Sequence, residues 1–233
     1  MKTDYDFIEI GTAFFDTLIE KATNEYGLSI EPIKEYLDKL PNKPNVTKIE
    51  GAIVANGDSK ELDVYYVTEE DIDKHKLGEW MKGCNSVGKP HDFHLNYFFC
   101  PWTWSRHKTG KDLPDTNPYK KMKSLPTHNL IKHGLVKTKK INCYYYSDLI
   151  KNYNINSVKR IKIDTEGYDC KILNSILDFY KETNNQLPTE ISFESGAHNI
   201  KDDVELCVNR LISLGYNIEI KEDGNVIEAK RNG

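Results

Sequence analysis

The chain lacks any apolar run long enough to span a membrane, and no secretory signal precedes its first predicted strand. Its five cysteines form no Cys-x-x-Cys pair and show no zinc-type spacing. These absences argue against membrane insertion and a secreted disulfide framework, and they favour a reducing compartment. We therefore expect a cytoplasmic protein with buried thiols at Cys143, Cys170 and Cys207.

A large net charge is missing as well. The 233 residues carry a formal net charge of −4, which argues against a general nucleic-acid binder. We expect the basic run Lys137–Lys140 to be a solvated loop. With 38% hydrophobic and 29% charged residues, the composition is ordinary for a soluble protein, and the length fits one α/β domain, 1–233, with room for a large insertion.

A complete Gly-x-Gly-x-x-Gly motif is absent, but a single glycine turn stands near the start of the chain. A short apolar strand, Phe7–Ile10, carries Glu9 and leads into Gly11, and helical pattern resumes from about Asp16. Glycine allows a ligand close to the backbone, and the unpaired N–H groups that open a helix can hold an anion. This order of elements indicates the cofactor-binding end of an α/β sheet, with an ordinary strand-to-helix turn as the alternative.

A second acid supports the cofactor interpretation. Gly27–Glu31 is a predicted strand that ends in Glu31, about twenty residues after the glycine turn, where an acid suits the two hydroxyls of a ribose. The alternative is an exposed acid that favours the start of a helix. Pro32 suits the first turn of the helix that we predict through Leu40.

The rest of the chain alternates between predicted strands and helices. The segment 68–127 is different, because it lacks sustained periodicity and is rich in Gly, Pro, His and aromatic residues. Such a segment is typical of a lid or a binding segment, with a disordered segment as the alternative. The pattern predicts an α/β, Rossmann-like doubly wound sheet, mostly parallel, with this irregular insertion and a C-terminal antiparallel hairpin at 216–230. Further strands are predicted near 45–54, 62–67, 140–146, 158–163 and 190–193, and helices near 147–153 (capped by Ser147 or Asp148), 172–180 and 204–212.

Four blocks of sequence resemble the S-adenosylmethionine-dependent methyltransferases, and more narrowly the FkbM-type O-methyltransferases. They are Ile8-Glu-Ile-Gly-Thr-Ala13, Ser29-Ile-Glu-Pro32, Glu50-Gly-Ala-Ile53 and Ile161-Lys-Ile-Asp-Thr-Glu-Gly-Tyr-Asp169. The last is the most specific, since FkbM-type chains carry a similar Lys-x-Asp-x-Glu-Gly-x-Glu run; here Asp169 replaces the final Glu. Phe15 departs from the family, which usually has Gly there. The resemblance covers most of the chain except 68–127 and implies the fold of class I methyltransferases.

The resemblance also implies a binding site for S-adenosylmethionine. Glu9 would face the ammonium group of the cofactor, Glu31 would bind its ribose, and Asp164 would lie near the sulfonium. The residues implied to bind the cofactor are Glu9, Gly11, Thr12, Ala13, Glu31, Pro32, Ala52, Ile53 and Asp164.

Methyl transfer to a sugar hydroxyl needs a general base, because the hydroxyl is a weak nucleophile. Asp164 is the first candidate, and the others are Glu166, Glu194, His91, His94 and His198. Asp164 could instead hold the loop or the cofactor, and Glu166 could bond backbone. A divalent metal, Mg²⁺ or Mn²⁺, held by Asp164 and Glu194 is a further possibility. Two histidines at i,i+3 alone do not indicate zinc.

The irregular segment gathers aromatic residues whose flat faces suit a sugar ring. We expect Trp102 or Trp104 to contact the acceptor, with anchoring of the segment to the sheet as the alternative. The residues expected to bind the acceptor are Trp102, Trp104, Arg106, Glu194 and His198.

The sequence thus predicts an S-adenosylmethionine-dependent O-methyltransferase that acts on a sugar hydroxyl in glycan biosynthesis. One alternative is methylation of another small hydroxylated metabolite or of nitrogen, and another is a degenerate methyltransferase fold used as a binding module. The chain opens almost directly on its first strand. We therefore expect either a compact variant or a domain excised from a longer chain, fused to or associated with glycosyltransferase domains.

Overall fold

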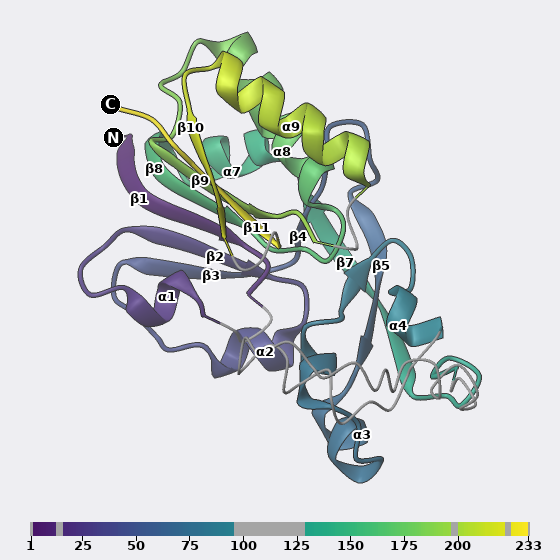
Figure 1. Ribbon diagram of the computed structural model, residues 1–233. Helices are drawn as coiled ribbons and strands as arrows, with labels where there is room; N and C mark the ends of the chain where they lie inside the picture. The colour runs from purple at the N-terminus through teal and green to yellow at the C-terminus, as the bar shows by residue number, and fades with distance from the viewer. Residues whose placement is uncertain (1, 13–15, 96–128, 197–199, 222–224, 233) are drawn as a thin grey trace.

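The described residues form an α/β structure with two β-sheets (Figure 1). The computed structural model describes residues 2–12, 16–95, 129–196, 200–221 and 225–232. The larger sheet has seven strands and the smaller has four. The predicted α/β fold with a mostly parallel sheet is confirmed, whereas the separate smaller sheet was not predicted.

The larger sheet runs in the order β10-β11-β9-β8-β1-β2-β3. Neighbours from β3 to β9 are parallel, and β11 is antiparallel to both β9 and β10, as the predicted hairpin requires. The strand order reverses between β1 and β8, which is the switch point of a doubly wound sheet. The strands are β1 (Thr3–Ile10), β2 (Gly27–Glu31), β3 (Val46–Glu50), β8 (Ile155–Ile163), β9 (Glu190–Glu194), β10 (Asn217–Lys221) and β11 (Val226–Lys230).

Three helices cover one face of this sheet: α7 (Tyr146–Asn152), α8 (Asp169–Thr183) and α9 (Lys201–Ser213) (Figure 1). The strands turn alternate apolar side chains toward these helices, as their two-residue period requires. Each such side chain stabilises the fold by about 1.5–3 kcal/mol when fully buried. This layer is the main core, and it includes Ile8, Ile10, Ile161, Ile163, Leu173 and Ile176.

The opposite face of the sheet carries polar side chains along β8, β9 and β11. Arg160, Lys162, Ser192 and Glu228 occupy alternate positions there and are partly or fully exposed. A parallel strand buried on both faces reads as a continuous apolar run, so this alternation marks a solvated face. The short helices α1 (Leu18–Lys21) and α2 (Lys34–Lys39) pack beside β2 and β3 instead.

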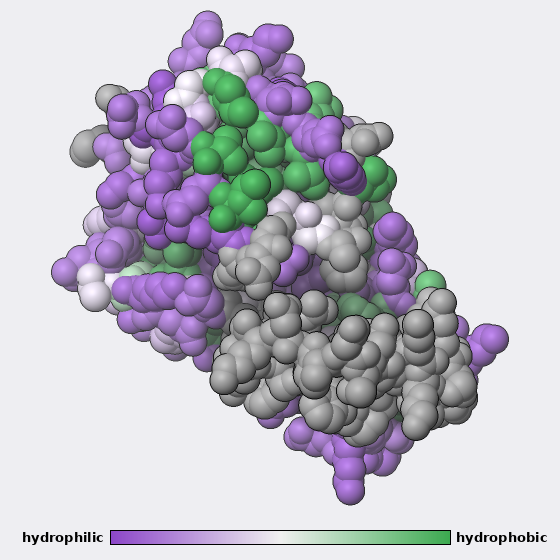
Figure 2. Space-filling model, viewed as in Figure 1, coloured by the Kyte–Doolittle hydropathy of each residue, from purple (hydrophilic) through white to green (hydrophobic). Residues whose placement is uncertain are grey.

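Apolar side chains are also exposed on α9 and β10. Figure 2 shows them gathered on the surface over these two elements, with polar residues around them. Leu206, Ile212 and Ile220 are 51%, 54% and 67% exposed.

The predicted strand at 45–54 is two strands in two sheets. β3 ends at Glu50, and β4 (Ala52–Ile53) pairs with β7 (Val136–Tyr144) of the smaller sheet. Gly51 makes the break, with φ of +151° and an N–H that donates to the Glu31 carbonyl at 3.1 Å. A Cβ at Gly51 would lie 2.7 Å from the Asn142 carbonyl oxygen. The prediction of one strand was wrong because this glycine turns the chain from one sheet into the other.

The smaller sheet has the order β4-β7-β5-β6, with β5 (Glu61–Val67) and β6 (Ser86–Val87) antiparallel to their neighbours. The basic run Lys137–Lys140 belongs to β7, so its prediction as a loop was wrong. Its solvation was predicted correctly, since Lys139 and Lys140 are exposed and pair with Glu50 and Glu61 at 2.7 and 2.8 Å.

The described part of the predicted irregular segment, 68–95, is ordered against the smaller sheet. It forms α3 (Glu69–Lys74), the 3₁₀ helix η1 (Glu79–Lys82), β6 and α4 (Asp92–Leu95). Periodicity missed these elements because each is six residues or shorter. They are held by a small apolar cluster of Val67, Ile72, Met81, Cys84 and Leu130.

Several helix starts differ from the prediction. The first helix is capped by Thr17, and α2 begins at Lys34, so Pro32 precedes that helix and is not in its first turn. The cap of α7 is Tyr145, not Ser147 or Asp148. Asp148 instead accepts the Tyr145 N–H at 2.9 Å from the first turn of the helix.

Candidate functional site

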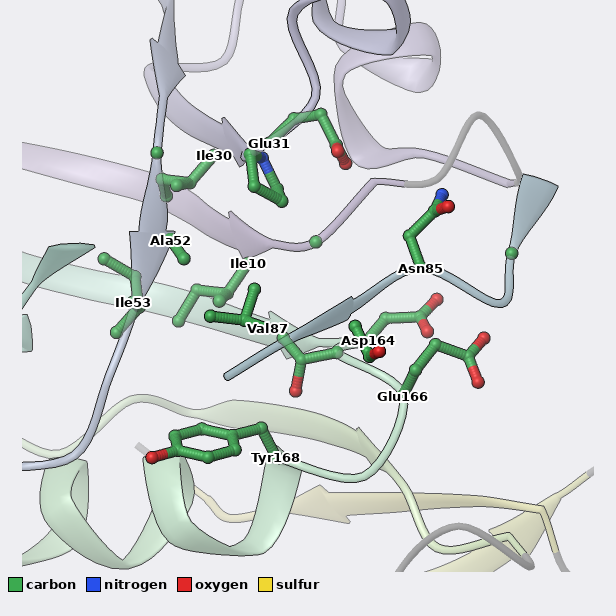
Figure 3. A pocket seen from close by; sticks show the side chains of 16 residues that line it. Ile10, Ile30, Glu31, Ala52, Ile53, Asn85, Val87, Asp164, Glu166 and Tyr168 are labelled. Atoms are coloured by element: carbon green, nitrogen blue, oxygen red, sulfur yellow. The ribbon is translucent and has the colours of Figure 1, made fainter. Parts of the chain in front are cut away.

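A cleft lies at the carboxyl ends of β1, β2 and β8, beside the point where the strand order reverses (Figure 3). This is where open α/β sheets bind ligands. The cleft has a volume of about 560 Å³, counting the part open to solvent. We call it the switch-point cleft; its described lining includes Ile10, Gly11, Glu31, Ala52, Ile53 and Asp164.

Gly11 forms the tight turn predicted at the end of β1. Its φ is +79°, and its N–H donates to the Ile30 carbonyl at 2.9 Å. On the other side, the Asp164 N–H donates to the Ile10 carbonyl at 2.9 Å. A Cβ at Gly11 would overlap the Asp164 carbonyl group. Only glycine therefore lets β1 and β8 end side by side at the mouth of the cleft.

Glu31 is buried where β2 ends, and it binds the backbone on both sides of the cleft. Its Oε2 accepts the N–H and the hydroxyl of Thr12 at 3.1 and 2.9 Å, and its Oε1 accepts the Ile33 N–H at 2.9 Å. The structure thus brings Thr12 and Glu31 into contact next to Gly11. Gly11 and Glu31 line the cleft whereas Thr12 does not, and cofactor binding by these residues stays a prediction.

Glu9 lies beneath the turn and does not line the switch-point cleft. Its carboxylate accepts the Leu18 N–H at 2.7 Å and the Ser29 hydroxyl at 3.1 Å. Burial raises the pKa of Glu9, and the Lys162 Nζ, 3.5 Å away, opposes that shift. These bonds fix the start of α1 against the sheet. The expected contact with an ammonium group of a cofactor stays a prediction.

Apolar and acidic side chains occupy different parts of the cleft (Figure 3). Ile10, Ile30, Ala52, Ile53 and Val87 form the apolar part, and the carboxylates of Asp164 and Glu166 lie at the other end. A flat apolar group with a polar tail would match this division.

Three carboxylates come together where β8 and β9 end. Asp164, Glu166 and Glu194 each place an oxygen within 4.8 Å of the others. Burial raises the pKa of Asp164, although Lys162, whose Nζ is 3.8 Å from Oδ2, opposes the shift. Burial, with the charges of Asp164 and Asp169, raises the pKa of Glu166 well above its usual range. A proton or a cation would relieve this crowding.

Asp169 holds the turn between β8 and α8, a role that the sequence reasoning missed. Its buried carboxylate accepts the Thr165 and Glu194 N–H groups, each at 3.3 Å, and the Gly167 N–H at 3.2 Å. Burial, with the charge of Asp164, raises the pKa of Asp169 to about 6. The signal in the sequence was an acid at a helix start directly after the Glu-Gly turn.

We expect Asp169→Ala to lower the free energy of unfolding by about 3 kcal/mol, because several buried N–H groups lose their acceptor. Urea denaturation at neutral pH measures this loss. Glu182→Ala, an exposed position on the same helix, should change stability by less than about 0.5 kcal/mol. Equal losses in the two variants would contradict the role given to Asp169.

His91 and His94 are buried against the turn that carries Glu166. The His91 Nδ1 accepts the Phe93 N–H at 3.1 Å, so a neutral His91 carries its proton on Nε2, which lies 3.4 Å from Glu166 Oε2. The His94 Nδ1 accepts the His91 N–H at 3.2 Å. Burial lowers the pKa of each histidine to about 4. In this arrangement His91 contacts Glu166, and a direct role for either histidine as base stays a prediction.

We expect these histidines to destabilise the fold in acid. Each pKa is depressed in the folded state, so its stabilising effect is complete above pH 6.5 and is lost as the pH falls toward 4. The loss is at most about 3 kcal/mol per histidine.

The buried carboxylates, whose pKa values are raised, change the stability in the opposite direction as the pH falls. The test therefore compares urea denaturation of the wild type and of His94→Gln at pH 7.5 and at pH 5. From pH 7.5 to pH 5, the wild type should lose more stability than His94→Gln does. His75→Gln, which changes an exposed histidine, should lose as much stability as the wild type. Identical pH slopes in wild type and His94→Gln would contradict the prediction.

The segment Gly83–Val87 lines one side of the cleft. It belongs to 68–127, the predicted lid or binding segment, but none of its residues was singled out as a site residue. Asn85, Ser86 and Val87 line the cleft together with Tyr168, whose hydroxyl donates to Asp58. Other predicted site residues lie outside the described part of the chain: Ala13, Trp102, Trp104, Arg106 and His198. Pro32, Ala52 and Ile53 line the cleft, and their contact with a cofactor stays a prediction.

Comparison with models of protein families, with curated proteins and with solved structures gives no match. In the described residues, no helix has both the length and the apolar character needed to cross a membrane. The chemistry of the switch-point cleft therefore has to be argued from its own residues.

Proposed function

We propose that the protein is an S-adenosylmethionine-dependent O-methyltransferase that acts on a sugar hydroxyl. The observation that carries the proposal is the convergence of three features on one cleft. The Gly11 turn, the Glu31 carboxylate and the Asp164 carboxylate stand at the ends of three adjacent strands, on either side of the switch point. The sequence blocks that resemble methyltransferases are the ones that meet there.

The residues of the cleft fit this cofactor. Glu31 offers acceptors for the ribose hydroxyls, and Ala52 and Ile53 offer an apolar surface for adenine. Gly11 brings the backbone turn after β1 to the wall of the cleft, where it can contact the methionine part. When bound, the cofactor supplies an electrophilic methyl group on a sulfonium.

Asp164 is the residue that we propose as the general base. It lines the cleft beside Gly11, and its raised pKa makes it a better proton acceptor than an ordinary aspartate. The positive charge of Lys162 favours the ionised form and opposes part of this pKa shift. Asp164 would take the proton of the acceptor hydroxyl as the new oxygen–carbon bond forms, while the remaining residues hold the reactants in line.

Asp164 and Glu194, joined by Glu166, could also supply oxygen ligands for Mg²⁺ or Mn²⁺. Such a cation would lower the pKa of the acceptor hydroxyl. Carboxylates that close together also occur without an ion, so metal dependence stays a prediction. Location in the cytoplasm and association with glycosyltransferase domains are likewise part of the proposal.

The proposal is tested by incubating the protein with S-adenosylmethionine labelled in its methyl group and a panel of neutral oligosaccharides, with and without Mg²⁺ or EDTA. We expect label in a sugar and an equal amount of S-adenosylhomocysteine. Cofactor binding without transfer to any sugar, but with transfer to an amine or another hydroxylated metabolite, would overturn the choice of acceptor. No cofactor binding by folded protein would overturn the class of activity.

A further inference from the structure

Another cleft shares Asp164 with the switch-point cleft. It is at the carboxyl ends of β8 and β9 and the start of β11, which are neighbours in the larger sheet (Figure 1). Its volume is about 440 Å³, counting the part open to solvent. We call it the outer cleft; it is lined by Lys162, Asp164, Ser192, Glu194, Asn225 and Val226, among others. Asp164 lines both clefts.

The outer cleft is lined by side chains that donate hydrogen bonds and by side chains that accept them. Lys162 offers donors, Glu194 offers acceptors, and Ser192 and Asn225 offer both. The Asn225 Oδ1 and Glu194 Oε1 atoms converge beside Gly196, where each lies 3.2 Å from the position that a Cβ would take. Closely spaced donors and acceptors are what adjacent hydroxyl groups of a sugar can satisfy together.

The charges of the outer cleft select against an anionic ligand. The Lys162 ammonium is already shared by Glu9, at 3.5 Å, and Asp164, at 3.8 Å. Glu194 and Glu166 add two further carboxylates beside Asp164. A phosphate or a uronic acid would therefore meet more negative than positive charge.

We propose that the outer cleft is the acceptor site and that it takes a neutral sugar through Lys162, Ser192, Glu194 and Asn225. The proposal rests on the proposed function. Asp164 lines both clefts, so a hydroxyl of a sugar in the outer cleft can contact its carboxylate at the border with the switch-point cleft, beside the cofactor. Lys162, Ser192 and Asn225 thereby become residues that determine specificity.

The test uses protein saturated with S-adenosylhomocysteine and five probes: the methyl glycosides of glucose, galactose, mannose, rhamnose and fucose. Saturation-transfer NMR detects which glycosides bind, and calorimetry separately measures S-adenosylhomocysteine. Ser192→Trp fills the outer cleft. Lys230→Trp is the matched control, since it places the same ring at an exposed position on the polar face of β11. Glucose 6-phosphate and methyl glucuronoside probe the charge selection.

We expect at least one neutral glycoside to give a signal and both anionic sugars to give none. Ser192→Trp should abolish that signal and change the Kd of S-adenosylhomocysteine by less than twofold, and Lys230→Trp should keep both. A silent panel with bound S-adenosylhomocysteine, a glycoside signal that survives Ser192→Trp, or binding of the anionic sugars alone would overturn the inference. Failure of S-adenosylhomocysteine to bind the wild type would overturn the proposed function itself.

Discussion

Gly11→Ala should abolish cofactor binding and lower the free energy of unfolding by about 3 kcal/mol or more. Two costs add at this position. The backbone has φ of +79°, which an L side chain rarely adopts, and the new Cβ would overlap the Asp164 carbonyl. The overlap of the new Cβ with the Asp164 carbonyl is relieved only if the ends of β1 and β8 move apart. That movement displaces the Asp164 carboxylate and opens the cleft, so binding of S-adenosylhomocysteine should be lost together with stability.

Gly215→Ala is the matched control for this prediction. Gly215 also has a positive φ, +84°, but nothing lies within 4 Å of the position of its Cβ. This variant should lose only about 1 kcal/mol from the backbone conformation and should bind the cofactor as the wild type does. Urea denaturation and calorimetry measure the two quantities. A Gly11→Ala protein no less stable than Gly215→Ala, with normal binding, would contradict the geometry proposed for the turn.

Asp164→Asn should slow methyl transfer at least about 100-fold while leaving the affinity for S-adenosylhomocysteine within a few-fold. Asparagine is close in size to aspartate but cannot accept a proton from the acceptor hydroxyl. It also removes one charge from the crowded group with Glu166 and Glu194, so the fold should not be weakened by the change. The measurement is the single-turnover rate with a methyl-accepting sugar.

Glu190→Gln controls for loss of a carboxylate in general. Glu190 stands at the other end of β9 and pairs with Arg160 on the polar face of the sheet. It should transfer methyl at the wild-type rate. If Asp164→Asn is equally active, Asp164 has a structural role and the base is another group.

The central part of the site could be predicted because it depends on chain order and strand ends. Glu31 and Asp164 each follow a recognisable apolar strand, and parallel strands end at the same edge of a sheet. Gly11 was identifiable because a turn between a strand and a helix favours glycine. The meeting of Asp164 with Glu194 follows from the pairing of β8 with β9.

The features of the fold and the site that could not be predicted depend on contacts between segments far apart in the chain. His91 meets Glu166 only because short elements fold back over the sheet, and no local pattern marks them. The role of Asp169 depends on the Glu194 N–H, which belongs to another strand. Gly51 could equally be a bulge within one strand by sequence alone. Packing against Asn142 and Tyr144 makes it the crossing between two sheets.

The most direct test of the account is calorimetric titration of S-adenosylhomocysteine into the wild type, Glu31→Ala and Glu50→Ala. Glu31 and Glu50 are register partners at the ends of β2 and β3, but only Glu31 lines the switch-point cleft. We expect micromolar binding that Glu31→Ala weakens at least tenfold, about 1.4 kcal/mol, and that Glu50→Ala leaves unchanged. Thermal melting confirms that each variant is folded. No heat from folded wild type, or equal affinities in all three proteins, would contradict the claim that this cleft binds the cofactor.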